Sequence, residues 1–330
     1  MGGETSGPEL LHRFKGTLIG CAVGDALGAP FEGKPRSFFN AGTVAFDEFQ
    51  RLPGFSPGQF TDDTQLTLAV AESLIQCGRF DPSDAAQRLG QLFSRGEIVS
   101  PGKATRGAMQ RFLASGDWRT AAAPEGEAGN TPAKSASPIG LWYHDRPDRL
   151  RDAAVAHCRV THQDVRAQAG AVAMARAVAH CLTERKLEPG SFLAAVAEPV
   201  AGICPPLANS LAELESWIAL PEDSALPLLV AAGAASKEAV DPQQGVPGFV
   251  VPTVLSVFYF FLRYHDDFEL CLQETIRAGG DVDTTASMVA SLCGAFNGLD
   301  AIPENLASTV HNFKYILEVA ERLFRRKTSN

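Results

Sequence analysis

Asp281-Val282-Asp283-Thr284-Thr285 stands directly before an almost wholly apolar segment of helical periodicity, and Thr61-Asp62-Asp63-Thr64 repeats this arrangement much earlier in the chain. Mg²⁺ and Mn²⁺ prefer carboxylate, hydroxyl and water oxygens as ligands. A centre with two such ions needs aspartates from separate segments that can bridge them. Together the two motifs therefore predict an oxygen-lined metal site built from two helix starts.

Each motif also has an ordinary structural interpretation. Asp and Thr are common helix N-caps, and Asp62-Asp63-Thr64-Gln65 fits a capping box. For one such motif alone, capping is the more common role. A cap needs only one acceptor, however, and each motif supplies two carboxylates, which repel one another unless water, a cation or helix amides compensate. The two roles are compatible, because one aspartate can cap a helix while its neighbour binds a metal.

The first predicted helix has an unusual spacing of glycines, which recur at every fourth position as Gly16, Gly20, Gly24 and Gly28. Each glycine costs about 1 kcal/mol of helix propensity relative to alanine, so some contact must compensate. A flat glycine stripe lets a second helix approach to backbone contact, and we expect such packing here. Asp25 lies within this apolar helix, so it must meet a metal shell, an amide, a cation or a hydrogen-bond donor of the core.

Composition limits the function classes. The chain has 330 residues with 45% hydrophobic and 20% charged residues, and its net charge is −9. These values support a substantial core and give no basic footprint for nucleic acid. Seven scattered cysteines without a Cys-x-x-Cys pair disfavour zinc ribbons and disulfide frameworks, so we expect a reducing, cytoplasmic setting. No secretion signal is recognisable in Met1–Pro8, and no apolar run is long enough to suggest a membrane span.

Helical periodicity dominates the chain, and strand-like alternation is nearly absent. Val44–Phe49 is the best strand candidate and could equally be a loop. We expect an all-α chain with one compact domain over residues 10–325 and flexible ends at 1–9 and 326–330, because none of the Gly/Pro-rich connectors resembles an interdomain linker. The expected helices are Leu11–Leu27, Thr64–Gln76, Pro82–Ser94, Thr105–Leu113, Arg149–Cys158, Asp164–Thr183, Gly190–Ala201, Ser210–Leu220, Val251–Tyr264, Phe268–Arg277, Thr284–Asn297 and about Pro303–Phe324.

Three ordered motifs spread over nearly the whole chain resemble the ADP-ribosylglycohydrolase family, which includes the dinitrogenase-reductase-activating glycohydrolases. They are Gly20-x3-Gly24-Asp25-Ala26-Leu27-Gly28 with Phe31-Glu32-Gly33, Phe60-Thr61-Asp62-Asp63-Thr64, and Gly279-Gly280-Asp281-Val282-Asp283-Thr284. The resemblance implies an orthogonal all-α domain with a central cleft that holds two divalent ions, Mg²⁺ or Mn²⁺. It implies as metal ligands Thr61, Asp62, Asp63, Asp281, Asp283 and Thr284, and as catalytic residues Glu32, Asp62 and Asp283.

Further matches implied by the resemblance concern the substrate. Ser100-Pro101-Gly102-Lys103 falls where the family places a phosphate-contacting glycine segment, and Arg159-Val160-Thr161-His162 resembles its Thr-His element. Glycines before Asp281 allow the backbone to come close to a ligand. The substrate-binding residues expected on these grounds are Gly102, Lys103, Asn130, Ser137, His162, Gly279 and Gly280. A histidine taken alone is more often a capping or core residue.

One loop departs from the family pattern. Gly129-Asn130 and Ser137-Pro138-Ile139-Gly140 match it, but Thr131, Pro132, Lys134 and Ser135 replace the usual Gly, small, Met and Arg positions. Val282 replaces the more common Thr between the two aspartates, with little chemical consequence expected. The metal-ligand set itself is intact, which favours activity over a degenerate binding copy.

The resemblance implies a metal-dependent hydrolase that removes ADP-ribose from a serine or arginine side chain or from a small conjugate such as O-acetyl-ADP-ribose. ADP-ribose and ADP-ribosylated proteins would be its partners, and we expect a monomer. Two alternatives stay open: a non-catalytic ADP-ribose-binding or structural relative, and a phosphatase of the haloacid-dehalogenase type, since Asp281-x-Asp283-x-Thr285 matches that nucleophile motif. The phosphatase motif should follow a buried strand, whereas Glu274-Thr275-Ile276-Arg277 precedes it here and is predicted to be helical.

Overall fold

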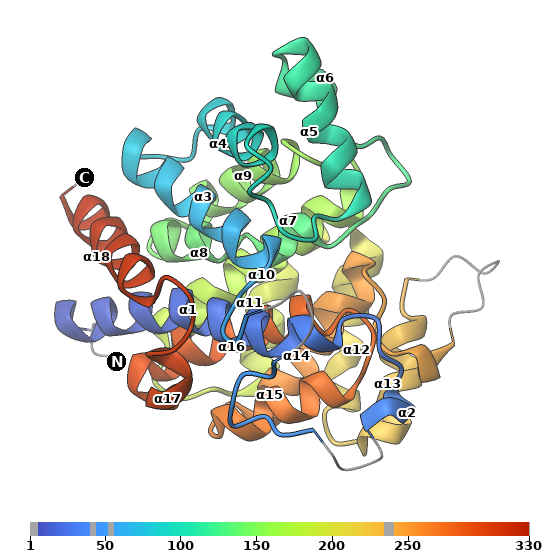
Figure 1. The fold of residues 1–330 in the computed structure, drawn as a ribbon. Helices are drawn as coiled ribbons and strands as arrows, with labels where there is room; N and C mark the ends of the chain where they lie inside the picture. The colour runs from blue at the N-terminus through green and yellow to red at the C-terminus, as the bar shows by residue number, and fades with distance from the viewer. Residues whose placement is uncertain (1–5, 40–43, 52–55, 234–240, 330) are drawn as a thin grey trace.

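The first and the sixteenth helices form the centre of the fold (Figure 1). The computed structural model describes residues 6–39, 44–51, 56–233 and 241–329. Helix α1 (Gly7–Gly28) packs along α16 (Val282–Asn297) in the antiparallel sense. A Cβ atom at Gly20 would lie 2.3 Å from the carbonyl oxygen of Ala290, and one at Gly24 would lie 2.2 Å from that of Ala286. The glycine stripe therefore lies in backbone contact with α16, as the sequence predicts.

The remaining helices surround this pair, and no residue in the described ranges belongs to a β-strand. The α-helices are α2 (Arg36–Phe39), α3 (Asp62–Cys77), α4 (Pro82–Ser94), α5 (Lys103–Ser115), α6 (Trp118–Ala121), α7 (Thr131–Lys134), α8 (Ser137–Tyr143), α9 (Pro147–Cys158), α10 (Val165–Thr183), α11 (Pro189–Ala201), α12 (Pro205–Trp217), α13 (Glu222–Ala231), α14 (Val250–Tyr264), α15 (Phe268–Arg277), α17 (Glu304–Ala307) and α18 (Phe313–Thr328). Short 3₁₀ helices are η1 (Ala29–Phe31), η2 (Pro242–Gln244) and η3 (Leu299–Ala301).

A second buried helix completes the core. Nearly every residue of α10 is inaccessible to solvent, and the helix contacts α8, α9, α11, α14 and α16. Its sequence is rich in alanine and has no large side chain on most faces, so several neighbours can pack closely around it. Helix α18 crosses α1 on the other side and also packs against α3 (Figure 1). The arrangement is the all-α domain expected from the sequence.

Most predicted helices are present with small shifts at their ends, and three differences have physical causes. The predicted helix from about Pro303 to Phe324 is interrupted between α17 and α18, where Asn312 adopts a left-handed backbone conformation with φ of 57°. Helix α13 occupies a segment in which the sequence predicts no helix, because Pro227 is accommodated inside it. Val44–Phe49 is irregular rather than a strand.

The predicted flexible ends overlap the terminal helices. Helix α1 begins at Gly7 and α18 ends at Thr328, so parts of the expected flexible segments are helical. Residues 1–5 and 330 lie outside the described residues. Among the helices that the structure describes, none is both long enough and apolar enough to cross a membrane.

The contact between α1 and α16 yields the first prediction. Gly24→Val places a branched side chain against the backbone of Ala286, and backbone atoms cannot move aside as the end of a flexible side chain would. We expect the free energy of unfolding to fall by about 3 kcal/mol or more through overpacking. Thermal and denaturant unfolding measure this change.

A matched control lies in the same helix. A Cβ at Gly7 would meet no heavy atom within 4 Å, so Gly7→Val should change stability far less. Equal melting temperatures for Gly24→Val and the unsubstituted protein would contradict the close-packing interpretation.

Candidate active site

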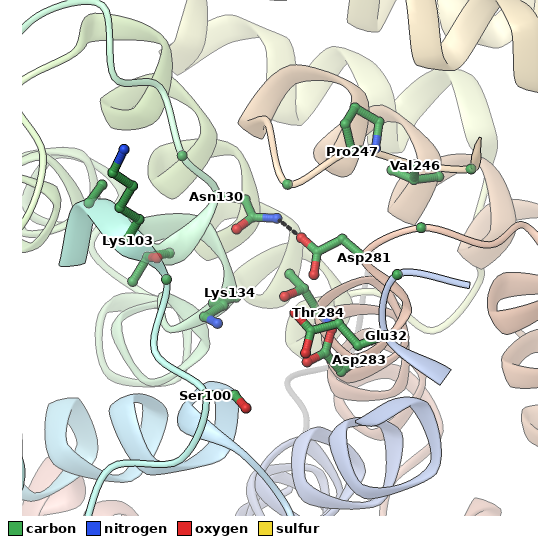
Figure 2. Close-up of a pocket in the computed structure, with 18 of the residues that line it drawn as sticks. Glu32, Ser100, Lys103, Asn130, Lys134, Val246, Pro247, Asp281, Asp283 and Thr284 are labelled. Carbon is green, nitrogen blue, oxygen red and sulfur yellow. Dashed lines mark hydrogen bonds between the residues drawn. The ribbon is translucent and has the colours of Figure 1, made fainter. Parts of the chain in front are cut away.

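A cavity with a volume of about 760 Å³ opens beside the N-terminus of α16 (Figure 2). That volume is typical of sites for small organic ligands. Segments that are far apart in sequence line it: the end of η1, the starts of α3, α5 and α16, the loop before α7, and residues 241–248. The lining residues are Glu32, Gly33, Asp62, Ser100, Gly102, Lys103, Ala104, Gly129, Asn130, Thr131, Lys134, His162, Asp241, Gln244, Gly245, Val246, Pro247, Gly248, Gly280, Asp281, Asp283 and Thr284.

Two glycine-rich backbone segments cross and hold in place the acidic wall of this cavity, which is formed by Glu32, Asp281 and Asp283. Gly279 and Gly280 have φ values of 74° and 84°, which residues with side chains rarely adopt. A Cβ at Gly280 would lie 2.2 Å from the carbonyl oxygen of Val246, and the N–H of Asp281 donates to that oxygen at 2.8 Å. The N–H of Gly280 also donates to the carbonyl of Lys34 at 2.8 Å. These contacts fix the residue at which α16 begins.

Three carboxylates meet at this helix start. Oxygen atoms of Glu32, Asp281 and Asp283 lie within 4.8 Å of one another. No other group of three Asp, Glu, His or Cys side chains in the described ranges comes as close together. Figure 2 shows the three side chains gathered with Thr284 on one side of the cavity. Asp283 is 3% exposed, whereas Glu32 lies at the open edge. Burial, together with the neighbouring Asp281, raises the pKa of Asp283 well above its ordinary value and raises the pKa of Glu32. Such a cluster can hold a cation, which would stabilise its ionised form.

Asp25 is a buried acceptor rather than a lone charge. Its carboxylate accepts hydrogen bonds from the N–H and hydroxyl of Thr61 at 2.9 and 2.8 Å, and from the N–H and hydroxyl of Thr64 at 2.9 and 2.7 Å. Burial still raises the pKa of Asp25 to about 7, and the nearby Asp63 contributes. Of the alternatives that the sequence left open, a hydrogen-bonded core position is the one observed. Asp25 thereby fixes the first turn of α3 against α1.

Lys134 lies opposite the acidic wall and points toward the carboxylates (Figure 2). Its Nζ is 2.8 Å from Oδ2 of Asp63 and 3.1 Å from Asp62, and only 6% of the residue is exposed. Burial alone would lower the pKa of Lys134, but Asp62 and Asp63 raise it well above its ordinary value, so the side chain is a permanent ammonium. The sequence marked Lys134 as a departure from the family pattern without revealing this contact.

The two aspartates at the start of α3 differ in their remaining partners. Asp63 also accepts a hydrogen bond from the hydroxyl of Ser287 at 3.3 Å and does not line the cavity. Asp62 lines the cavity, and its Oδ2 accepts no hydrogen bond. Burial raises the pKa of Asp62 to about 7, although Lys134 opposes this rise. Asp62 thus borders the cavity, while the ammonium of Lys134 lies 3.1 Å from each of its carboxylate oxygens.

Asn130 positions an acidic residue. Its side-chain amide donates to Oδ2 of Asp281 at 2.6 Å and to the hydroxyl of Thr253 at 3.0 Å (Figure 2). The carboxylate of Asp281 is therefore oriented from across the cavity by the loop that precedes α7. A fixed ligand orientation is a common feature of metal sites with supporting hydrogen bonds.

The far wall of the cavity offers donors rather than acceptors. Helix α5 begins at Lys103, its N-cap Gly102 has no side chain to satisfy the first amides, and Ser100 has a φ of 49°. Exposed N–H groups at a helix start form a binding site for anions. Lys103 adds an exposed ammonium at the same position.

His162 is buried but retains one free nitrogen. Nδ1 lies 2.9 Å from the hydroxyl of Thr161, whereas Nε2 is buried without a protein partner and the residue lines the cavity. A Cβ at position 129 would lie 2.9 Å from Nε2, so Gly129 leaves room beside the ring. Burial lowers the pKa of His162 to about 4, which keeps the imidazole neutral.

The structure brings most of the predicted site residues together. Ten of them line the cavity: Glu32, Asp62, Gly102, Lys103, Asn130, His162, Gly280, Asp281, Asp283 and Thr284. Thr61, Asp63, Ser137 and Gly279 are not among the lining residues. Residues 241–248 form a wall that the sequence did not reveal, because this Gly/Pro-rich stretch reads only as a connector.

Comparisons with known proteins agree with the geometry. A sequence model described as ADP-ribosylglycohydrolase matches residues 6–330. The chain is 29% identical over 311 residues to the ADP-ribosyl-[dinitrogen reductase] glycohydrolase of Rhodospirillum rubrum, with 92% of each chain covered. It is 26% identical over 347 residues to the ADP-ribosylhydrolase ARH3 of Xenopus tropicalis, with 95% of each covered. It is also 26% identical over 326 residues to the ADP-ribosylarginine hydrolase Tri1 of Serratia proteamaculans, with 96% of this chain and 80% of that protein covered.

A solved structure described as an ADP-ribosylglycohydrolase-related protein complex superposes with a TM-score of 0.74 at 31% identity, covering 97% of this chain and 99% of that one. The chain therefore belongs to the ADP-ribosylglycohydrolase family and is an enzyme of that glycohydrolase type.

The buried carboxyl groups predict a pH dependence of stability in metal-free protein. Asp25 and Asp62 have pKa values of about 7 in the folded state, and the pKa of Asp283 lies well above its ordinary value. Aspartates in the unfolded chain ionise near pH ~4, so between about pH 4 and 7 the folded state binds more protons and its stability falls as pH rises. The melting temperature of metal-stripped protein should therefore drop across this range.

Saturating Mn²⁺ should flatten the dependence, because a bound cation favours the ionised carboxylates. A melting temperature that stays constant or rises with pH in the metal-stripped protein would contradict the assigned pKa shifts.

Proposed function

We propose that this member of the ADP-ribosylglycohydrolase family hydrolyses, with the help of a divalent metal, the glycosidic bond between ADP-ribose and its acceptor. The acceptor is a serine or arginine side chain of a protein, or a small group as in O-acetyl-ADP-ribose, and the reaction reverses ADP-ribosylation. The observation that carries the proposal is one cavity with three convergent carboxylates on one side and anion-binding amides on the other.

The donor-lined wall supports binding of a diphosphate. The first amides of α5 at Gly102, Lys103 and Ala104 border the cavity, and a helix N-terminus of this kind favours negative charge. Binding of a diphosphate by these amides does not require a basic surface patch, which agrees with the net charge of −9. Nε2 of His162 can exchange a hydrogen bond with a sugar or base, because a buried polar atom without a partner is costly unless a ligand satisfies it.

The acidic wall suits a hard divalent cation. Glu32, Asp281 and Asp283 would hold it, with the hydroxyl of Thr284 beside them, and an all-oxygen set suits Mg²⁺ and Mn²⁺ alike. When bound, the ion would supply charge stabilisation and orientation of ribose hydroxyls and a water at the anomeric carbon. Asn130 keeps Asp281 oriented for this role.

The chain's own carboxylates provide the acid–base chemistry. Cleavage of a glycosidic bond passes through a cation-like ribose, which nearby negative charge stabilises. Glu32 lies at the open edge of the cavity and is the candidate to exchange a proton with the departing group. Asp62 lines the cavity and is the candidate to accept a proton from the attacking water.

The cellular location and the oligomeric state are also part of the proposal. All seven cysteines are unpaired thiols, which supports a reducing, cytoplasmic location. We also propose a monomer, the state expected from the sequence.

A phosphatase of the haloacid-dehalogenase type is not supported. Its nucleophile motif requires a preceding strand, whereas Asp281 follows α15 and two glycines, and the described part of the chain contains isolated bridges but no strand. A non-catalytic role is disfavoured because all the expected carboxylates are present.

Titration calorimetry of ADP-ribose into metal-stripped protein tests the proposed function. We expect little binding without metal and micromolar binding after Mg²⁺ or Mn²⁺ is added, because the cation screens the carboxylates from the ligand. Asp281→Ala should behave like the metal-stripped protein even when metal is present. The exposed surface variant Asp266→Ala serves as the matched control. Absence of binding in all conditions would refute ADP-ribose as the ligand.

Glu32→Gln separates catalysis from binding. Loss of a general acid or base lowers turnover by roughly 10²- to 10⁴-fold, while the neutral amide keeps the side chain's size. At Mn²⁺ concentrations high enough to keep the metal site filled despite the loss of one carboxylate, we expect kcat on an ADP-ribosylated substrate to fall by that factor and the Kd for ADP-ribose to change by less than about threefold. Equal losses in kcat and affinity would make Glu32 a binding residue instead.

A further inference from the structure

Lys134 contacts residues that the family resemblance implies to be metal ligands. Thr61, Asp62 and Asp63 are the ligands expected at the start of α3, yet the ammonium of Lys134 lies 2.8 Å from Asp63 and 3.1 Å from both carboxylate oxygens of Asp62. The expected Met at this position would carry no charge. The residues at the start of α3 therefore do not fit a second divalent ion, whereas those at the start of α16 fit the first.

We propose that the ammonium of Lys134 serves as a built-in cation in place of one metal ion, so that this enzyme holds a single divalent ion at Glu32, Asp281 and Asp283. This inference rests on the proposed function, because it concerns the metal content of the same site. It differs from the two-metal centre that the sequence motifs imply.

The hydrogen bonds of Asp63 support the proposal. Its Oδ2 accepts from Lys134, and its Oδ1 accepts from the hydroxyl of Ser287 at 3.3 Å. Both oxygens thus have protein partners, and Asp63 is fully buried and outside the cavity lining. The hydroxyl of Thr61 is engaged as well, since it donates to Asp25 at 2.8 Å. A metal at this position would have to break several of these bonds.

Electrostatic repulsion also disfavours a second metal ion at the start of α3. A Mg²⁺ or Mn²⁺ ion binds carboxylate oxygens at about 2.1 Å, so an ion on Asp63 Oδ2 would lie within about 5 Å of Nζ of Lys134. Two cations at this distance repel each other strongly in a buried site that contains little solvent. Moving the ammonium away would leave Asp62 and Asp63 as buried adjacent carboxylates without their partner.

Lys134 already compensates part of the negative charge of the site. Five carboxylates face the site, and Lys134 interacts electrostatically with the aspartates of both helix starts. Lys134 also lies across the cavity from the Glu32 cluster (Figure 2). The five are Glu32, Asp62, Asp63, Asp281 and Asp283.

Counting bound Mn²⁺ tests the proposal directly. Metal-stripped protein is dialysed against Mn²⁺, the ions per chain are determined by elemental analysis, and the bound ions are examined by electron paramagnetic resonance. We expect one ion per chain and the signal of an isolated Mn²⁺. Lys134→Met should bind two ions and give the signal of a coupled pair. Lys103→Met removes a charge from the same cavity away from Asp62 and Asp63, so it should still bind one ion.

Two ions in the unsubstituted protein would overturn the proposal. One ion in a folded Lys134→Met variant, with circular dichroism like that of the parent, would overturn it too. If that variant does not fold, Asp63→Asn decides: it should still bind one ion, and loss of the ion would show that Asp63 is a ligand.

Failure of the proposed function would give a different experimental result from failure of this inference alone. A protein that binds no Mn²⁺ and no ADP-ribose would refute both the function and this inference. A protein that binds two ions and hydrolyses ADP-ribosylated substrate would refute the role of Lys134 alone.

Discussion

The backbone contact between α1 and α16 is the constraint on which the rest of the structure depends. Glycines on α1 allow the two helices to approach until a single added carbon would overlap carbonyl oxygens. That approach brings Gly28 against the backbone of Asp283 and places Asp25 where it can receive the first turn of α3. Two helix starts from distant parts of the chain therefore converge on one place because two helices can touch without side chains between them.

Charge compensation is the second constraint, and it explains why the site needs partners from several loops. Five carboxylates in and around a largely buried centre repel one another, and their raised pKa values express that cost. Asn130 and Lys134 come from the loop and short helix at 130–134, so one segment both orients Asp281 and neutralises Asp62 and Asp63. The remaining acidic cluster, which contains Glu32 and Asp283, is where we propose that an added cation binds and prepares the site for an anionic ligand.

Local signals made much of this predictable from the sequence. The glycine spacing predicted the α1–α16 contact, and the paired Asp motifs predicted two helix starts at one site, because both patterns depend on short-range spacing. The role of Lys134 could not be read from sequence, since it depends on the distance between segments more than sixty residues apart. The loop at 241–248 escaped prediction for the same reason: only its crossing with Gly279 and Gly280 makes it part of the cavity. Asp25 was recognised as special, but its partners Thr61 and Thr64 became evident only in three dimensions.

A crystal structure of the protein with Mn²⁺ and ADP-ribose, recorded at the manganese absorption edge, tests the central claim most directly. We predict one anomalous peak among Glu32, Asp281 and Asp283, the diphosphate at the start of α5, and Lys134 still paired with Asp62 and Asp63. A second peak between Asp62 and Asp63 with the ammonium displaced, or a ligand bound outside this cavity, would contradict the account.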